Sequence, residues 1–214
     1  MPVIVIGGHT RNLGKTQLVV EIIRAFPQAH WWALKITQFG HGVCSINGEA
    51  CGCAAEEHTF AIQEERDAAG RGDTCRMLAA GAQRVFWVRS KQGRLAEAMP
   101  SLRRKLSRAE NIVIESNTLL RFLKPDLYLP VLDFRRADFK SSAREFLDRA
   151  DAYVLLASPT AGQAPASGAP AWDSVSLKPL ERRPLFVVWP QHMCPPSLQA
   201  FIREKVFSPA PASG

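Results

Sequence analysis

Short apolar runs recur along the chain and are separated by stretches in which apolar residues repeat at helical spacing. The runs are rich in Val, Ile, Leu and aromatic residues and are continuous rather than alternating. That pattern is typical of strands buried on both faces of a mostly parallel sheet. It predicts seven strands, at 3–6, 32–36, 85–88, 112–114, 127–132, 153–156 and 185–188.

Between several of these runs, apolar residues repeat at helical spacing. It predicts amphipathic helices over 18–26, 95–106 and 139–147, with Asp138 as the N-cap of the third. Strands that alternate with helices predict an α/β fold, a doubly wound and mostly parallel sheet with helices on both faces. We expect a single domain over residues 1–214, without internal repeats.

Two stretches have the composition of loops. The segment 159–184 begins with PTAGQAPASGAP, which is rich in Pro, Gly and Ala and carries no charge. It predicts a loop or linker, and residues 208–214 predict a frayed tail.

Composition excludes several classes of protein. The chain is 46% hydrophobic and 22% charged, and no apolar run is long enough to span a bilayer. The start, MPVIVIGGH, lacks the basic region and cleavage site of a signal peptide. We therefore expect a cytoplasmic protein without a membrane partner, whose cysteines are thiols or metal ligands rather than disulfides.

The formal net charge of +7 is compatible with nucleic acid or with phosphorylated small molecules as partners. The densest basic stretch, LRRKLSRAE, falls largely on one face of the predicted helix 95–106, where a solvated surface explains it. No zinc-finger, RNP or basic-zipper pattern is present, so nucleic acid is not expected as a partner.

The strongest motif is VIVIGGHTRNLGKTQLVV, in which a strand leads through a glycine-containing loop to GKT and a helix. That context is typical of a P-loop, whose amides and helix N-terminus bind phosphates. Lys15 would bridge the β- and γ-phosphates, and the Thr16 hydroxyl would bind Mg²⁺. The predicted nucleotide-binding residues here are Gly8, Asn12, Leu13, Gly14, Lys15, Thr16 and Gln17.

The motif is imperfect, because the usual spacing places glycine at position 9 and this chain has His9. A chance GKT after a strand remains an alternative, and His9 receives no role. The predicted strand 112–114 is followed by Glu115, where a Walker B carboxylate would reach Mg²⁺. The alternative for Glu115 is a surface carboxylate where the strand leaves the core.

Three further stretches resemble one known family. These are WWALKITQFGHG, RGDTCRMLAAGA and IVIES, which begin at Trp31, Arg71 and Ile112. With GKT, their order and spacing over residues 1–133 are similar to those of the MobB family, the molybdopterin-guanine dinucleotide biosynthesis protein B group. The stretch DTCRMLAAGA discriminates best, because GKT is common to many NTPases.

The resemblance implies a cytoplasmic, dimeric P-loop protein that binds GTP or ATP and hydrolyses it weakly. Such proteins assist attachment of a nucleotide to the molybdenum cofactor, which implies a protein partner in cofactor biosynthesis. Lys15, Thr16, Asp73 and Glu115 match the family's nucleotide and Mg²⁺ motifs. The sequence departs from the family after Lys35, where Ile, Thr and Gln replace histidines, and at Ser116, where the family has glycine.

The segment 40–70 looks like an insertion and contains Cys44, Cys51, Cys53 and His58. Thiolates and imidazole suit Zn²⁺, and four such ligands can complete a tetrahedral site. An Fe–S cluster is a weaker alternative. The remaining alternative is a loop in which small thiols pack and His58 caps a helix.

The sequence thus supports a nucleotide-binding accessory protein with weak hydrolysis. Two other functions stay open. One is an ATP-dependent small-molecule kinase or ligase, and the other is a metal-responsive, nucleotide-switched binding protein or metallochaperone.

Overall fold

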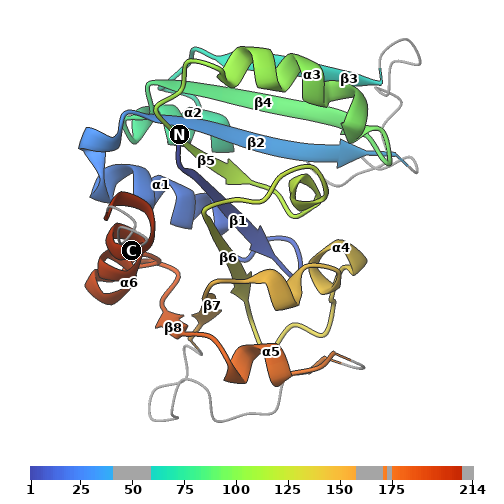
Figure 1. Cartoon of the computed structure of the whole chain (residues 1–214), viewed down its shortest axis with the longest axis vertical. Helices are drawn as coiled ribbons and strands as arrows, with labels where there is room; N and C mark the ends of the chain where they lie inside the picture. The colour runs from blue at the N-terminus through green and yellow to red at the C-terminus, as the bar shows by residue number, and fades with distance from the viewer. Residues whose placement is uncertain (41–58, 158–170, 173–174, 209–214) are drawn as a thin grey trace, which may run out of the picture.

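The computed structural model describes residues 1–40, 59–157, 171–172 and 175–208. In this part of the chain one sheet of eight strands runs through the molecule in the order β3-β4-β2-β5-β1-β6-β7-β8 (Figure 1). The strands are β1 (Val3–Gly8), β2 (Trp31–Phe39), β3 (Phe60–Glu65), β4 (Arg84–Lys91), β5 (Asn111–Glu115), β6 (Leu127–Leu132), β7 (Tyr153–Leu156) and β8 (Leu185–Val188).

The helices cover both faces of this sheet (Figure 1). They are α1 (Lys15–Ala25), α2 (Asp73–Ala79), α3 (Leu95–Leu106), α4 (Ser141–Arg144), α5 (Lys178–Glu181) and α6 (Pro196–Ile202). Short 3₁₀ turns lie at Pro27–Ala29, Thr118–Arg121 and Leu147–Arg149, and a π-helical turn at Arg203–Phe207 follows α6.

All neighbouring strands pair in parallel except β3, which pairs antiparallel with β4 at one edge. The parallel strands therefore end together at one edge of the sheet, which we call the carboxyl edge. In parallel α/β sheets this edge is where ligands bind.

Alternate residues of each central strand enter two separate cores. Ile4 and Ile6 of β1 pack with α1, α2 and α6, whereas Val5 between them packs on the other side with α3. Because both faces are buried, the central strands have no polar alternation, which explains their continuous apolar runs. The predicted doubly wound, mostly parallel α/β fold is confirmed.

The seven predicted strands are all present, and 127–132, 153–156 and 185–188 match their observed bounds. The sequence did not predict β3, an edge strand whose second half is Gln-Glu-Glu. It lies within the predicted insertion 40–70. Residues 41–58 lie outside the described part of the chain.

The predicted helix over 139–147 is wrong in extent. Only α4 and a 3₁₀ turn form there, and the residue before α4 is Lys140 rather than Asp138. Asp138 does not cap a helix, because its carboxylate accepts a hydrogen bond from Thr10. The segment 159–184, predicted as a loop or linker, contains the short helix α5.

In the described part of the chain, no helix has the length and apolar character needed to cross a membrane.

Candidate functional site

A loop joins β1 to α1 at the carboxyl edge, and we call residues 8–16 the 8–16 loop. Asn12 and Gly14 have φ values of 55° and 76°, in the left-handed region that glycine adopts without strain. No side chain caps α1, and its first turn contains no acidic residue. The amides at the start of this helix are therefore free to bind an anion, which the helix dipole also favours.

Gly7 and Gly8, at the end of β1, let the backbone pass close to neighbouring residues. A Cβ on Gly7 would lie 2.7 Å from the hydroxyl oxygen of buried Tyr128, and one on Gly8 would lie 3.3 Å from the carbonyl oxygen of Val131. Asn117 fixes the same backbone with two hydrogen bonds. Its Oδ1 accepts from the amide of Gly8, and its Nδ2 donates to the carbonyl of Gly8, both at 2.9 Å.

His9 occupies the position where a glycine was expected, and its side chain is fully buried beside the loop. Its Nε2 accepts the amide of Asp133 at 3.0 Å, and its Nδ1 lies 2.8 Å from the carbonyl of Asp138. The ring packs against Phe139 and Trp172, with centroids 5.1 Å away in each case. Burial lowers the pKa of His9, so the imidazole is a neutral anchor for the loop.

Lys15 begins α1 and turns back over the loop. Its Nζ donates to the carbonyl oxygen of Thr10 at 3.0 Å. Burial lowers the pKa of this ammonium group, and the nearby Lys35 lowers it further. A half-buried ammonium group that contacts no carboxylate among the described residues is a favourable partner for phosphate oxygens.

The second feature of the site is a group of four side chains, which we call the Lys35 cluster. It comprises Lys35, Thr16, Asp73 and Glu115. The Thr16 hydroxyl donates to Glu115 Oε2 at 2.6 Å. Lys35 Nζ lies 3.4 Å from both carboxylate oxygens of Glu115 and 3.5 Å from Thr16 Oγ1, and it pairs directly with Asp73.

The strand register explains why this cluster forms. Lys35 on β2 lies opposite Glu115 on β5, so their side chains point to the same face of the sheet. Ala33 and Val113, two residues earlier on each strand, pack in the core beneath α1 and α2. Lys35 and Glu115 therefore emerge at the carboxyl edge on the side where those two helices begin.

The edge strand β3 holds the start of α2. Glu65 at its end accepts hydrogen bonds from the hydroxyl of Thr74 at 2.6 Å and the thiol of Cys75 at 3.3 Å. These contacts fix Asp73, the first residue of α2, toward Lys35. Burial opposes ionisation of Asp73, but the hydrogen bond and charge of Lys35 outweigh it and lower the pKa of this carboxyl.

A cavity of about 1180 Å³ opens over the loop and the cluster. It continues past them to Arg71, Trp87 and Arg121. Lys140 also lines it, and burial together with Lys15 and Arg11 lowers the pKa of Lys140 to about 8. Asp73 and Glu115 are the acidic residues among its described lining, so the cavity is strongly basic.

The structure brings together all the residues predicted for nucleotide and Mg²⁺. They line the cavity as a group: Gly8, Asn12, Leu13, Gly14, Lys15, Thr16, Gln17, Asp73 and Glu115. The Leu13 residue is only 1% exposed and packs in the core, so it can serve a ligand mainly through its backbone. Gln17 accepts a hydrogen bond from Arg76, which joins α1 to α2.

The predicted metal ligands Cys44, Cys51, Cys53 and His58 lie outside the described residues, and this site remains a prediction. In the chain as described, no group of three or more His, Cys, Asp or Glu side chains could hold a metal. Cys75 and Cys194 are buried and free. Burial and the nearby Glu21 raise the pKa of Cys194 to about 12, which favours the unreactive thiol.

Lys35 and Asn117 belong to the candidate site but were not predicted as members of it. Both are polar residues at or just after the end of a predicted strand, where side chains gather at the carboxyl edge. That position was the available signal. Their partners, however, are 80 and 109 residues away in sequence.

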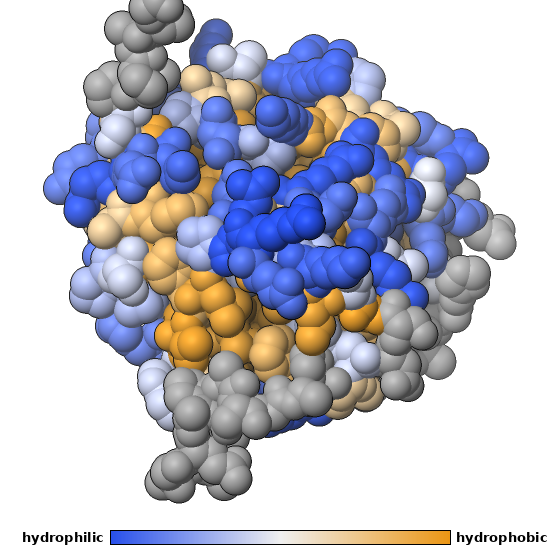
Figure 2. All heavy atoms as spheres, turned by 60° about the horizontal axis from the view of Figure 1, so that its bottom comes forward, coloured by the Kyte–Doolittle hydropathy of each residue, from blue (hydrophilic) through white to orange (hydrophobic). Residues whose placement is uncertain are grey.

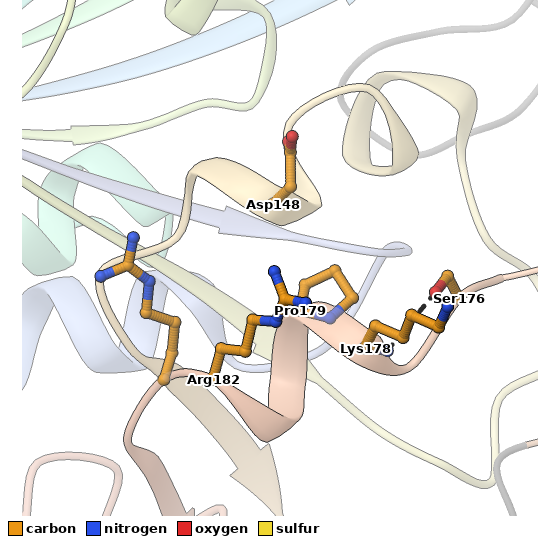
Figure 3. Close-up of a pocket in the computed structure, with 6 residues that line it drawn as sticks. Asp148, Ser176, Lys178, Pro179 and Arg182 are labelled. Carbon is orange, nitrogen blue, oxygen red and sulfur yellow. Dashed lines mark hydrogen bonds between the residues drawn. The ribbon is translucent and has the colours of Figure 1, made fainter.

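A second hollow, of about 570 Å³, lies at the opposite edge of the sheet, before β7 and β8 begin. Its lining comprises Asp148, Ser176, Lys178, Pro179, Arg182 and Arg183 (Figure 3). The edge strand β8 exposes Leu185 (38%) where it begins, and Trp189 (49%) is exposed just after its other end. Figure 2 shows polar and apolar areas next to each other on the side of the molecule that includes this end.

Comparisons with known proteins give fold-level similarity only. No family model and no curated protein matches the sequence. Among solved structures, LpxK from Aquifex aeolicus in complex with ATP is 16% identical, with a TM-score of 0.47. That alignment covers 87% of this chain but 53% of LpxK, so this chain spans about half the length of that structure. HypB from Helicobacter pylori in complex with nickel is 12% identical, with a TM-score of 0.48 over 94% of this chain and 86% of HypB.

Proposed function

We propose that this chain binds a nucleoside triphosphate together with Mg²⁺ at the carboxyl edge of the sheet. The observation that supports this most directly is the convergence of two features. The amides of α1 are uncapped beside Lys15, and the next residue, Thr16, donates to Glu115. A polyphosphate needs amide donors and a lysine, and its metal needs hard oxygen ligands, side by side.

Each residue of the site has a defined part in this proposal. Amides of the 8–16 loop and of the first turn of α1 would bind the phosphates, and Lys15 would leave the carbonyl of Thr10 to contact them. The hydroxyl of Thr16 and the carboxylates of Glu115 and Asp73 fit Mg²⁺, which prefers oxygen ligands. When bound, Mg²⁺ would neutralise phosphate charge.

The site favours binding over fast hydrolysis. Among the described residues that line the cavity there is no histidine, and the only carboxylates belong to the Lys35 cluster. No lining carboxylate or imidazole is therefore left to orient an attacking water. We propose slow turnover, as expected of an accessory protein that uses nucleotide as a ligand or switch.

At the finer level we propose an adaptor similar to the MobB family, which prefers GTP, acts as a homodimer and serves a protein partner in molybdenum cofactor biosynthesis. The support is the resemblance of the motifs, in particular DTCRMLAAGA from Asp73. A GTP affinity at least about tenfold above that for ATP, worth about 1.4 kcal/mol, would support this assignment. Equal affinities would contradict it.

The decisive experiment compares Lys15→Ala with Lys178→Ala in titrations with fluorescent N-methylanthraniloyl GTP and ATP in Mg²⁺. Lys178 lies in the second hollow, so its substitution removes the same charge far from the loop. We expect Lys15→Ala to weaken binding at least about 100-fold, because it removes a charge-assisted phosphate contact. Retention of wild-type affinity by Lys15→Ala would show that nucleotide does not bind at this loop.

A second candidate function is an ATP-dependent kinase or ligase acting on a small anion. The observation in its favour is that the cavity continues beyond the loop to Arg71, Trp87 and Arg121. This function predicts that ATP turnover rises when phosphorylated or carboxylate compounds are added. A panel of such acceptors that leaves turnover at the basal rate would favour the accessory protein.

A further inference from the structure

Lys35 occupies the centre of the group of oxygens assigned above to Mg²⁺. Its ammonium contacts Glu115 at 3.4 Å and Thr16 at 3.5 Å, and it pairs with Asp73. The side chain of Glu115 is 9% exposed and that of Lys35 is 17% exposed, whereas that of Asp73 is 40% exposed, so water screens the contact between Lys35 and Glu115 weakly. Two carboxylates held this close together need a cation between them.

The oxygens around Lys35 are also the ones that a divalent cation would use. Thr16 and Glu115 would hold Mg²⁺, whose bonds to oxygen are short, about 2.0–2.1 Å. An ammonium group in contact with the same oxygens leaves no room for it and repels it. The two cations are therefore competitors for one position.

We propose that Lys35 is a built-in counter-cation that holds the Mg²⁺ position in the nucleotide-free protein and is displaced when Mg²⁺ arrives with nucleotide. This inference rests on the proposed function. In this proposal Lys35 is a positioning residue. It keeps Thr16, Asp73 and Glu115 in place until the metal replaces it.

A bound nucleotide would offer the displaced Lys35 ammonium a new partner. Lys35 lines the same cavity as the 8–16 loop, and a lysine side chain has a flexible four-carbon stem that can turn toward a new partner. A phosphate group bound at the loop would accept hydrogen bonds from it. The exchange thus couples metal binding to nucleotide binding. Metal alone would leave the Lys35 ammonium without an anionic partner, whereas a bound nucleotide would supply a phosphate as the new partner.

The test uses nucleotide-free protein and Mn²⁺ alone, with free Mn²⁺ measured by electron paramagnetic resonance. The variants Lys35→Met and Lys35→Gln remove the competing charge, and the Gln variant keeps a hydrogen-bond donor for the carboxylates. We expect both to bind Mn²⁺ at least about tenfold more tightly than the wild type. An unchanged or weaker Mn²⁺ affinity in the folded variants would overturn the proposal.

The matched control is Lys140→Met. Lys140 lines the same cavity but makes no ion pair with Asp73 or Glu115. Its removal changes the net charge by the same amount, and we expect a change in Mn²⁺ affinity of no more than about twofold. An equal tightening in this control would mean that general charge, not the position of Lys35, governs the site.

A measurement on the wild-type protein does not depend on how the variants fold. Acetylation of each lysine is followed by mass spectrometry with and without saturating Mn²⁺. We expect the Lys35 amine to react several-fold faster once Mn²⁺ displaces it, while Lys140 keeps its rate. A Lys35 rate that Mn²⁺ leaves unchanged would contradict displacement.

Failure of this inference and failure of the proposed function give different results. Wild-type protein that binds fluorescent nucleotide, together with variants of unchanged Mn²⁺ affinity, would refute the role of Lys35 alone. Wild-type protein that binds no nucleotide would refute the proposed function, whatever the Mn²⁺ titrations show.

Discussion

Two hollows in the described part of the chain are both lined by basic side chains, yet they differ in the backbone beside them. At the carboxyl edge, Lys15 begins an 11-residue helix that no side chain caps. At the opposite edge, Lys178 begins a four-residue helix whose next residue is Pro179, which has no amide hydrogen to donate (Figure 3). The first hollow combines charge with oriented amides, and the second offers charge from flexible side chains.

Positive charge alone therefore does not define a phosphate site. Lysine and arginine side chains attract any anion in solution, and salt screens that attraction. Backbone amides fixed by a glycine-containing loop add direction, because their donors converge on one position. Gly7→Ala, Thr16→Val and a pH titration of Lys140 would separate the contribution of backbone geometry from that of charge.

Among the further variants, the largest effect should come from a substitution that leaves the net charge unchanged. Gly7→Ala would place a methyl group 2.7 Å from the hydroxyl of buried Tyr128 and against Asn117, so the loop must shift. We expect nucleotide affinity to fall about 100-fold and the free energy of unfolding by about 2 kcal/mol. Fluorescent-nucleotide titration and chemical denaturation measure the two quantities.

Gly72→Ala is the matched control for that substitution. Its added Cβ would lie 3.4 Å from the sulfur of Cys75, an ordinary contact, and its φ of −66° suits alanine. We expect stability close to the wild type. If both variants were equally stable and both bound nucleotide normally, the close approach at Gly7 would have no functional meaning.

The next effect concerns Thr16, the proposed metal ligand on α1. Thr16→Val removes the hydroxyl that donates to Glu115 and nearly preserves the shape of the side chain. We expect nucleotide affinity in Mg²⁺ to fall about tenfold, and affinity in EDTA to stay near that of the wild type. Thr118→Val removes a hydroxyl elsewhere in the cavity lining and should leave both affinities unchanged. Equal losses with and without Mg²⁺ would show that Thr16 acts on the phosphates rather than on the metal.

The smallest effect is a pH dependence. Because the pKa of Lys140 is lowered to about 8, this lysine is charged at pH 7 and largely neutral at pH 9. Its attraction for phosphate is therefore present below pH 8 and lost as the pH rises. We expect the deprotonation of Lys140 to lower the nucleotide affinity about threefold between pH 7 and pH 9.

Titrations at both pH values with Lys140→Met separate this lysine from Lys15, whose pKa burial also lowers. The variant should lose the part of the pH dependence that belongs to Lys140. A pH profile identical to that of the wild type would show that Lys140 does not face the bound phosphates.

Most of the fold could be predicted because the central strands are buried on both faces, and burial leaves a clear signal in sequence. The edge strand β3 was missed because it is only half-covered, so its second half, Gln-Glu-Glu, resembles a loop. The helix predicted over 139–147 failed for a tertiary reason. Asp138 accepts a hydrogen bond from Thr10, 128 residues earlier, instead of capping the helix.

The site was predictable where its chemistry is local and unpredictable where it depends on strand register. The GKT motif reveals Lys15 and Thr16 because a loop and a helix start occur in one short stretch. The partnership of Lys35 with Glu115 depends on β2 lying directly beside β5. No local pattern in sequence specifies which strands become neighbours.

The anchoring of His9 bears on how such loops are recognised in genomes. A text pattern that demands glycine at position 9 rejects this chain, although the close backbone approaches occur at Gly7 and Gly8. The imidazole is instead directed away from the loop, into the aromatic packing with Phe139 and Trp172. A search written in spatial terms, for an uncapped helix start beside two crowded glycines, would accept a histidine there and retrieve loops that letter-by-letter matching discards.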